Sequence, residues 1–258
     1  MSPLIQAAFA GRAARALAAV ALVLSAAPLA HAQQAPAAAV SPRALALGGD
    51  LAKLLNDEET TRLQTRKMIR ETVPAAFNAN PDIAALEKLY PGMIKYVVDR
   101  MEPEIMRQTL VSLPQLWARL GAIYASALNE AELTEVSGFF HRPVGQKLVQ
   151  IMTSEMDFSA ALTRMLAAND ETVKTSDLDA AQRAALPELM RNISRQEGTE
   201  ILRFASTPAG QKLRELRPKL LQVAAEWSNE SDPAEDALIE KIVEEAMTEF
   251  VEKTGAKQ

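Results

Sequence analysis

The sequence predicts an all-α protein, a helical bundle built around two repeated helix-elbow-helix units, and three observations support this prediction. The chain of 258 residues is 48% hydrophobic and only 5% aromatic, so Ala and Leu, which favour helices, supply most of its apolar content. Beyond residue 42 apolar side chains recur at helical spacing, and no segment sustains the alternation of a strand. In addition, one helix-elbow-helix motif occurs twice, at an offset of 65 residues.

Residues 1–32 have the organisation of a secretory signal peptide. Two arginines precede a run of twelve residues, 16–27, that is apolar except for one Ser, and the segment ends in Ala-His-Ala. The apolar run is shorter than the roughly 20 residues that cross a bilayer, and small residues at the end suit a signal peptidase. We expect cleavage after Ala32 and a periplasmic or secreted protein, with an uncleaved anchor helix as the alternative. Residues 33–42, which contain two prolines, are expected to be a disordered linker.

The composition removes several kinds of chemistry. With no Cys and two His, the chain has no disulfide, no thiolate nucleophile and too few ligands for a Cys or His metal centre. It also lacks the common nucleophile and phosphate-loop motifs, so we expect no catalytic residue, no cofactor and no metal site. The net charge of −5, which becomes more negative without the signal peptide, argues against nucleic acid and anionic membrane surfaces as partners.

Turn-forming residues are expected to divide the exported chain into short helices. An N-terminal helical region over residues 43–114 contains such breaks at Gly48-Gly49, Asn80-Pro81, Pro91-Gly92, Pro103 and Pro114. The sequence indicates no role for this region.

The repeated motif occupies residues 129–148 in its first copy and residues 194–213 in its second, and the two align without gaps. Nine of the seventeen positions from Glu132 to Leu148 are identical between the copies. The positions that define the motif are Asn129, Glu132, Phe139, Pro143 and Gly145 in the first copy, and Ser194, Glu197, Phe204, Pro208 and Gly210 in the second.

Each defining position has a mechanical role in a bent pair of helices. Asn129 and Ser194 are good N-caps, and the glutamate three residues later can accept a bond from the cap's own N–H, which completes a capping box. A phenylalanine ends the first helix, and the proline then stands at the first position of the next helix, where its missing N–H costs nothing. The following glycine, Gly145 or Gly210, allows the preceding helix to approach closely.

The first copy also resembles a known family. The phrases that carry the resemblance are Ile123-Tyr124-Ala125, Glu132-Leu133, Phe139-Phe140 and Pro143-Val144-Gly145-Gln146-Lys147-Leu148. This pattern resembles the bacterial domain of unknown function 2059 (DUF2059), whose members typically show a capped helix, a Phe-Tyr pair, Ser-Pro-x-Gly and a second helix. Phe140 replaces the usual Tyr, and Arg142 replaces the Ser that would cap the second helix.

The resemblance covers residues 115–170 as a first helical hairpin. A diverged second copy lies within residues 171–258, over about 180–230, and is followed by a C-terminal amphipathic helix. The resemblance implies a small exported helical domain of unassigned activity, and it supplies no catalytic residue.

Three residues are candidates for binding a ligand. Lys147 and Lys212 recur in the first turn of the second helix, where they could bind an anion or, alternatively, be solvated above apolar side chains. Glu155 stands where Leu220 continues an apolar seam in the second copy. If Glu155 faces the same groove, it is a buried acid that needs a partner and a candidate for a ligand site; the alternative is that it reaches solvent.

The leading functional hypothesis is a non-catalytic exported protein of the cell envelope that binds an apolar ligand or an envelope protein. One alternative is a carboxylate-dependent hydrolase acting on envelope material, because the 33 acids offer many pairs that could flank a scissile bond. The other is a structural homo-oligomer, in which the amphipathic helix over residues 234–253 pairs its apolar face with a second copy.

Overall fold

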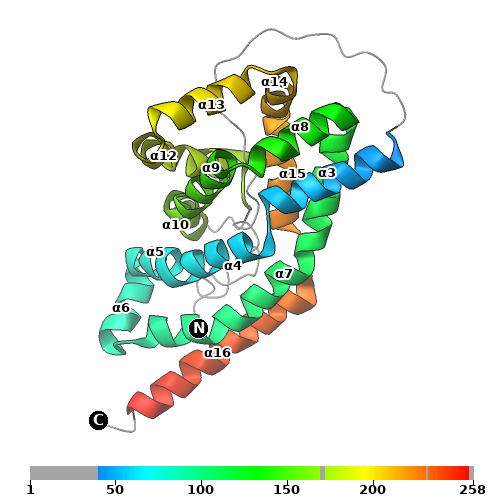
Figure 1. The fold of residues 1–258 in the computed structure, drawn as a ribbon. Coiled ribbons are helices and arrows are strands. Elements are labelled where there is room, and N and C mark those ends of the chain that lie inside the picture. The colour runs from blue at the N-terminus through cyan, green and yellow to red at the C-terminus, as the bar shows by residue number, and fades with distance from the viewer. Residues whose placement is uncertain (1–39, 169–171, 231, 256–258) are drawn as a thin grey trace.

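The computed structural model describes residues 40–168, 172–230 and 232–255, and the regular structure of this part of the chain is helical throughout (Figure 1). The predicted all-α fold is therefore confirmed. The predicted signal peptide lies outside the described residues, as does all but the end of the predicted linker, and Pro42 opens the first described helix. In chain order the elements are α3 (Pro42–Leu55), α4 (Glu58–Lys67), the π-helix η1 (Met68–Thr72), α5 (Val73–Ala79), α6 (Pro81–Leu89), α7 (Met93–Ala127), α8 (Glu130–Phe140), α9 (Pro143–Ser154), α10 (Ser159–Ala168), α11 (Thr175–Ala184), α12 (Leu186–Asn192), α13 (Arg195–Ala205), α14 (Pro208–Glu215), α15 (Arg217–Asn229) and α16 (Pro233–Gly255).

Helix α3 is continuous through its two glycines. It begins where the Ser41 hydroxyl accepts a hydrogen bond from the N–H of Ala44 at 3.0 Å. A Cβ on Gly48 would overlap the carbonyl oxygen of Gly121 in α7, and a Cβ on Gly121 would overlap the backbone of Gly49. The predicted break at the Gly48-Gly49 pair is wrong, because these glycines permit a close crossing of α3 and α7 rather than a turn.

Helix α7 runs for 35 residues through Pro103 and Pro114, so the breaks predicted there are also wrong. A proline inside a helix removes one backbone hydrogen bond and costs about 3 kcal/mol. Helix α7 tolerates two prolines because it buries a long row of side chains, among which Leu113, Leu116 and Leu120 are at most 1% exposed. Figure 1 shows that the helix is bent along its length, as internal prolines cause. The predicted boundary between residues 114 and 115 lies inside this helix.

Helix α16 runs antiparallel to the first half of α7 (Figure 1). Glu235 near its start meets Arg107, and Phe250 near its end packs on Tyr96 with 5.3 Å between ring centroids. The fully buried side chains of α16 are Ile239, Val243 and Ala246. Helix α7 of the same chain covers these side chains, while Leu238 of α16 is 40% exposed, and the homo-oligomer through this helix stays a prediction.

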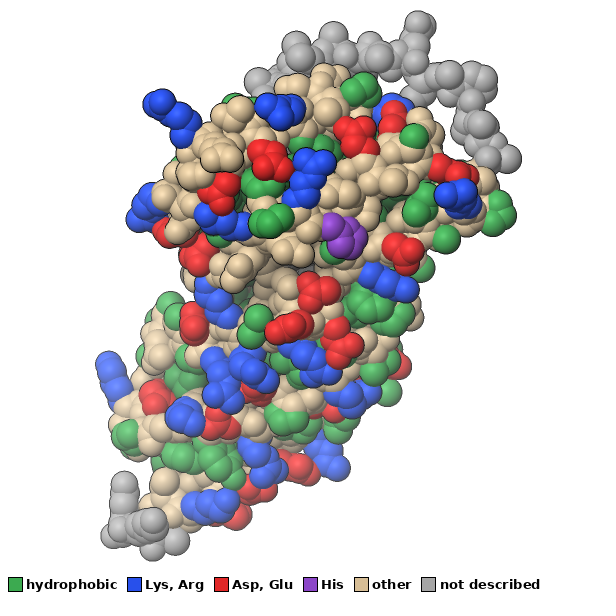
Figure 2. All heavy atoms as spheres, in the orientation of Figure 1, with side chains coloured by type: hydrophobic (Ala, Val, Ile, Leu, Met, Phe, Trp, Pro, Cys, Tyr) green, Lys and Arg blue, Asp and Glu red, His purple; other side chains and the backbone are tan. Residues whose placement is uncertain are grey.

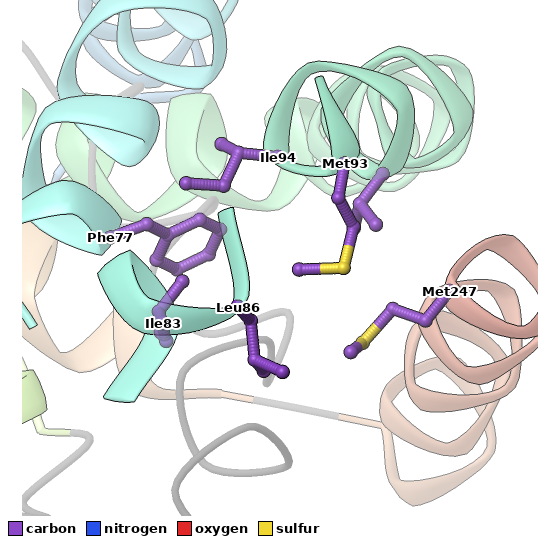
Figure 3. A pocket seen from close by; sticks show the side chains of 7 residues that line it. Phe77, Ile83, Leu86, Met93, Ile94 and Met247 are labelled. Atoms are coloured by element: carbon purple, nitrogen blue, oxygen red, sulfur yellow. The ribbon is translucent and has the colours of Figure 1, made fainter. Parts of the chain in front are cut away.

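A small apolar hollow lies where α6, α7 and α16 meet (Figure 3). Its volume is about 20 Å³, which is close to that of a single water molecule. Figure 3 shows Met93 from α7 and Met247 from α16 extending into this space with Leu86 from α6. The flexible methionines fill an irregular part of the core, and the space is too small for a ligand.

Helices α8 to α15 form one half of the molecule. Helices α3 and α7 connect it to the other half, which contains α4, α5, α6 and α16 (Figure 1). Helix α8 packs on α3, and α15 packs on α7 and α11. The two halves face each other where α4 meets α9 and where α5 meets α10. Within the described residues, no helix combines the length and apolar character that crossing a bilayer requires.

Candidate functional site

The two copies of the motif form two bent helix pairs, which we call the first elbow (α8 and α9) and the second elbow (α13 and α14). Both begin with a complete capping box. Asn129 accepts a hydrogen bond from the N–H of Glu132 at 3.0 Å, and the Glu132 carboxylate accepts one from the N–H of Asn129 at 2.9 Å. The corresponding distances for Ser194 and Glu197 are 3.2 and 2.8 Å. The spacing of these residues predicts both helix starts correctly.

The bend is built in the same way in both elbows. Pro143 and Pro208 are the first residues of the second helices. A Cβ on Gly145 or on Gly210 would overlap the carbonyl oxygen of the phenylalanine at or near the end of the preceding helix. The glycine is therefore required by the close approach of the two helices at the elbow.

The two elbows pack on each other reciprocally. The rings of Phe139 and Phe204 stack with 4.0 Å between centroids and 4° between planes. Helix α14 packs on α8 and α13 packs on α9, so each elbow places its second helix against the first helix of the other. The two elbows are therefore related by an approximate two-fold symmetry, as the subunits of a self-complementary dimer are.

Two equivalent ion pairs also join the elbows, each between the second helix of one elbow and the first helix of the other. Lys147 lies 2.9 Å from the carboxylate of Glu197, and Lys212 lies 2.7 Å from that of Glu132. Hydrogen bonds from the backbone of Ser194 and from the Lys147 ammonium lower the pKa of Glu197 to about 2. Both lysines that the sequence proposes for ligand binding thus have partners inside the chain, and an anion would have to compete with these carboxylates.

Glu155 is the C-cap residue of α9 and is exposed, with a 3.1 Å hydrogen bond from the Ser154 hydroxyl. Its counterpart Leu220 is buried in α15, a separate helix that begins after the chain turns at Leu216. The idea that Glu155 is a buried acid is wrong, because the backbones of the two copies diverge where α9 and α14 end. Glu155 does line a hollow, which is described below.

A ligand-sized cleft lies between α4 with η1 on one side and α9 on the other. We call it the α4–α9 cleft; its volume is about 570 Å³, within the range of small-molecule sites. Figure 2 shows the surface hollowed between the two halves of the molecule, where these elements face each other. The apolar side chains that line the cleft are Leu54, Leu63, Phe140 and Val149.

An adjoining hollow of about 390 Å³ lies beyond the end of α9, and we call it the acidic hollow. Lys67 and Glu71 line both spaces, and Glu155 and Asp157 line the acidic hollow alone. Hydrogen bonds from Ser159, assisted by the charge of Lys67, lower the pKa of Asp157. The Lys67 ammonium donates to the backbone carbonyl of Ser154. The acidic hollow therefore holds three carboxylates and one ammonium that already has an acceptor.

Two polar side chains in the wall of the α4–α9 cleft are buried without full hydrogen bonding. Gln64 is 7% exposed and donates its amide to the carbonyl oxygen of Thr153 at 3.2 Å, but its Oε1 has no partner among the described residues. Thr153 is 5% exposed, and its Oγ1 also has no partner there. An unpaired buried polar group costs about 1–3 kcal/mol. Both residues line the cleft, so a bound molecule is one group that could complete their hydrogen bonds.

The π-helix η1 shapes one wall of both spaces. Pro74, which follows it, has no N–H to donate to the carbonyl four residues earlier, and the chain instead forms a wider turn in which the N–H of Val73 bonds to the carbonyl of Met68. Single π-turns inside helices often occur at functional sites. This turn begins directly after Lys67 and contains Glu71, the two residues shared by the cleft and the acidic hollow.

The sequence did not reveal half of this site. Its prediction leaves residues 43–114 without a role, yet α4 and η1 supply Leu63, Gln64, Lys67 and Glu71 to the cleft. The sequence does contain one sign of a site in this region, because polar side chains recur at helical spacing on the face that α4 buries. These side chains are Thr61, Gln64 and Thr65.

The fold and the site define an all-helical protein with two reciprocally packed elbows and a ligand-sized cleft. Residues 114–169 match the bacterial family described as "Uncharacterized protein conserved in bacteria (DUF2059)". The predicted resemblance to this family is therefore confirmed for the segment that holds the end of α7, the first elbow and α10. No curated protein and no solved structure matches the chain.

Proposed function

We propose that the protein is an exported, non-catalytic helical protein of the cell envelope that binds a ligand with an apolar part in the α4–α9 cleft. The observation that carries this proposal is the cleft itself, whose volume is about 570 Å³ and whose wall combines four apolar side chains with Gln64 and Thr153. A space of this size, lined by four apolar residues and nine polar or charged ones, suits a small organic ligand that has both an apolar and a polar part.

Export is the part of the proposal that rests on residues 1–32, with their basic start, short apolar run and Ala-His-Ala end. The full chain expressed in a Gram-negative host should appear in the periplasmic fraction with Gln33 as its first residue. N-terminal sequencing of that fraction measures this directly. Protein that begins at Met1 and remains in the cytoplasm would contradict export without affecting the cleft.

Binding is tested with two matched tryptophan variants. Gln150 is exposed and lines the cleft, whereas Glu215 is exposed at the corresponding position of the second elbow, outside the cleft. In native mass spectra of the protein isolated from its own periplasm, we expect an added mass in the wild type and in Glu215→Trp that is lost in Gln150→Trp. A wild-type spectrum without any added mass would count against a binding function.

We further propose that the second elbow is a diverged copy of the first. The support is the nine shared residues together with the reciprocal packing of the two elbows. A chain in which residues 194–213 are replaced by the sequence of residues 129–148 should keep its helical circular dichroism and cooperative unfolding. Loss of cooperative unfolding would show that the two segments are not interchangeable.

A second candidate function is hydrolysis, which the three carboxylates of the acidic hollow favour: Glu71, Glu155 and Asp157. The lowered pKa of Asp157 keeps it charged, which suits a base or a nucleophile and not a general acid. Turnover of envelope-derived glycans or peptides that disappears in Glu71→Gln or Glu155→Gln would replace the binding proposal with this one.

A further inference from the structure

We infer that the α4–α9 cleft takes an organic cation, a ligand with an apolar body and an ammonium or guanidinium head that lies at the acidic hollow. The inference rests on the proposed binding function and specifies the ligand class. It is carried by two independent features of adjoining spaces, the charge balance of the acidic hollow and the unpaired acceptor oxygens in the wall of the α4–α9 cleft.

The charge balance of the acidic hollow favours a positive head group. Glu71, Glu155 and Asp157 line it, and Lys67, the one lysine in its lining, already donates to a backbone carbonyl. Neither Glu71 nor Glu155 forms an ion pair with another described residue. An ammonium between Glu71 and Glu155 is attracted by both, whereas a carboxylate in the same place is repelled by three acids and attracted by Lys67 alone.

The unpaired atoms of the cleft wall favour a hydrogen-bond donor. Gln64 Oε1 is an amide oxygen and can only accept, and the bond from the Gln64 amide nitrogen to the carbonyl of Thr153 fixes which end of the amide is the oxygen. The Thr153 hydroxyl can accept as well. Both oxygens are covered by neighbouring atoms. The Gln64 amide or the Thr153 side chain must therefore rotate before its oxygen can reach a ligand in the cleft. An ammonium offers three donors and a guanidinium five, while a carboxylate offers none.

The apolar part of the ligand has its own surface. Leu63 is 59% exposed, although it belongs to the wall of the cleft, and Val149 lies on α9 in the same wall. Lys67 and Glu71 border both the cleft and the acidic hollow, so the two spaces adjoin. One ligand can therefore place its body against these side chains and its head at the carboxylates.

Three probes that differ only in their head group test the inference: octylammonium, octan-1-ol and octanoate. Isothermal titration calorimetry of the full chain at low salt should show octylammonium binding at least about tenfold more tightly than octanoate, and 0.5 M NaCl should reduce this preference. The Glu71→Gln/Glu155→Gln variant should lose about fivefold or more in affinity for octylammonium while its affinity for octanol is unchanged. Glu215→Gln, which removes an exposed carboxylate outside the cleft, should behave as the wild type.

The outcomes separate this inference from the proposed function. If all three probes bind equally and Gln150→Trp blocks all of them, the cleft is a binding site and the cation inference is wrong. Equal affinity of the double variant and the wild type for octylammonium would also overturn the inference. If no probe binds to the wild type, both the inference and the binding function fail. Circular dichroism of each variant confirms that it is folded.

Discussion

The first and second elbows share the residues that bend them but differ in the surface that they present. Val149 and Gln150 on α9 line the α4–α9 cleft, and the corresponding residues of α14 are Arg214 and Glu215. Helix α9 is 12 residues long and leads to the acidic hollow, while α14 ends after 8 residues. The shared residues thus build the contact between the elbows, whereas the residues that differ place the cleft at the first elbow.

The largest effect is expected at the aromatic stack between the elbows. Phe139→Ala and Phe204→Ala each remove a buried ring that packs on the other at 4.0 Å. We expect each to lower the free energy of unfolding by about 3–5 kcal/mol, measured by urea denaturation followed by circular dichroism.

The double variant measures how strongly the two rings depend on each other. Because the two rings share one contact, Phe139→Ala/Phe204→Ala should cost less than the sum of the single changes, by about 0.5–1.5 kcal/mol. Additive losses would show that each ring is stabilised by its own elbow, and not by the other one.

The next largest effect is expected at the glycines of the bends. A Cβ on Gly145 or on Gly210 would overlap a backbone oxygen, which cannot move as a flexible side chain can. Gly145→Ala and Gly210→Ala should each destabilise the protein by about 1–3 kcal/mol in the same urea experiment. The control is Gly138→Ala in α8, where a Cβ would meet no atom within 4 Å and replacing glycine should stabilise the helix. Equal stability of Gly145→Ala and the wild type would contradict the close approach.

A smaller effect tests the cap that distinguishes the elbows. Thr207 caps α14 through a 3.1 Å hydrogen bond from the N–H of Gly210, whereas Arg142 makes no side-chain cap at α9. Thr207→Ala should cost about 1 kcal/mol, and Arg142→Thr should stabilise the first elbow by up to about the same amount. Thermal unfolding of the two variants measures both changes, and a destabilised Arg142→Thr would show that the 3.3 Å ion pair of Arg142 with Glu200 matters more than the cap.

The smallest expected effect is a pH dependence at the second elbow. The pKa of Glu197 is lowered from its ordinary 4.5 to about 2 in the folded protein, so its stabilising contribution is present above pH 4.5 and is lost as the pH falls towards 2. Glu197→Gln should remove this part of the acid dependence of the urea midpoint. A Glu197 titration midpoint near 4.5 by NMR would contradict the hydrogen bonds assigned to its carboxylate.

Local features of the elbows could be predicted from the sequence because their causes are local. The capping boxes at Asn129 and Ser194 involve residues three positions apart, and the prolines act on the turn in which they stand. The same reasoning failed at the Gly48-Gly49 pair, Pro103 and Pro114, where the packing of α3 and α7 outweighs the local preference of glycine and proline to end a helix.

The candidate site could be predicted only in part. Lys147 and Glu197 are 50 residues apart in the chain, so the sequence shows that both recur without showing that they meet. Gln64 and Thr153 are 89 residues apart, and neither has a motif that marks it. The prediction of a buried Glu155 requires the two copies to keep the same backbone beyond their shared residues, and they do not.

The helical class, the two bends and the resemblance to DUF2059 can be predicted from the sequence, because periodicity, caps and turn residues act over a few positions along the chain. Long-range packing, in contrast, places the elbows against each other, α16 on α7, and α4 with η1 opposite α9 to form a cleft. These contacts depend on the combined fit of surfaces far apart in the chain, and no local spacing encodes that fit.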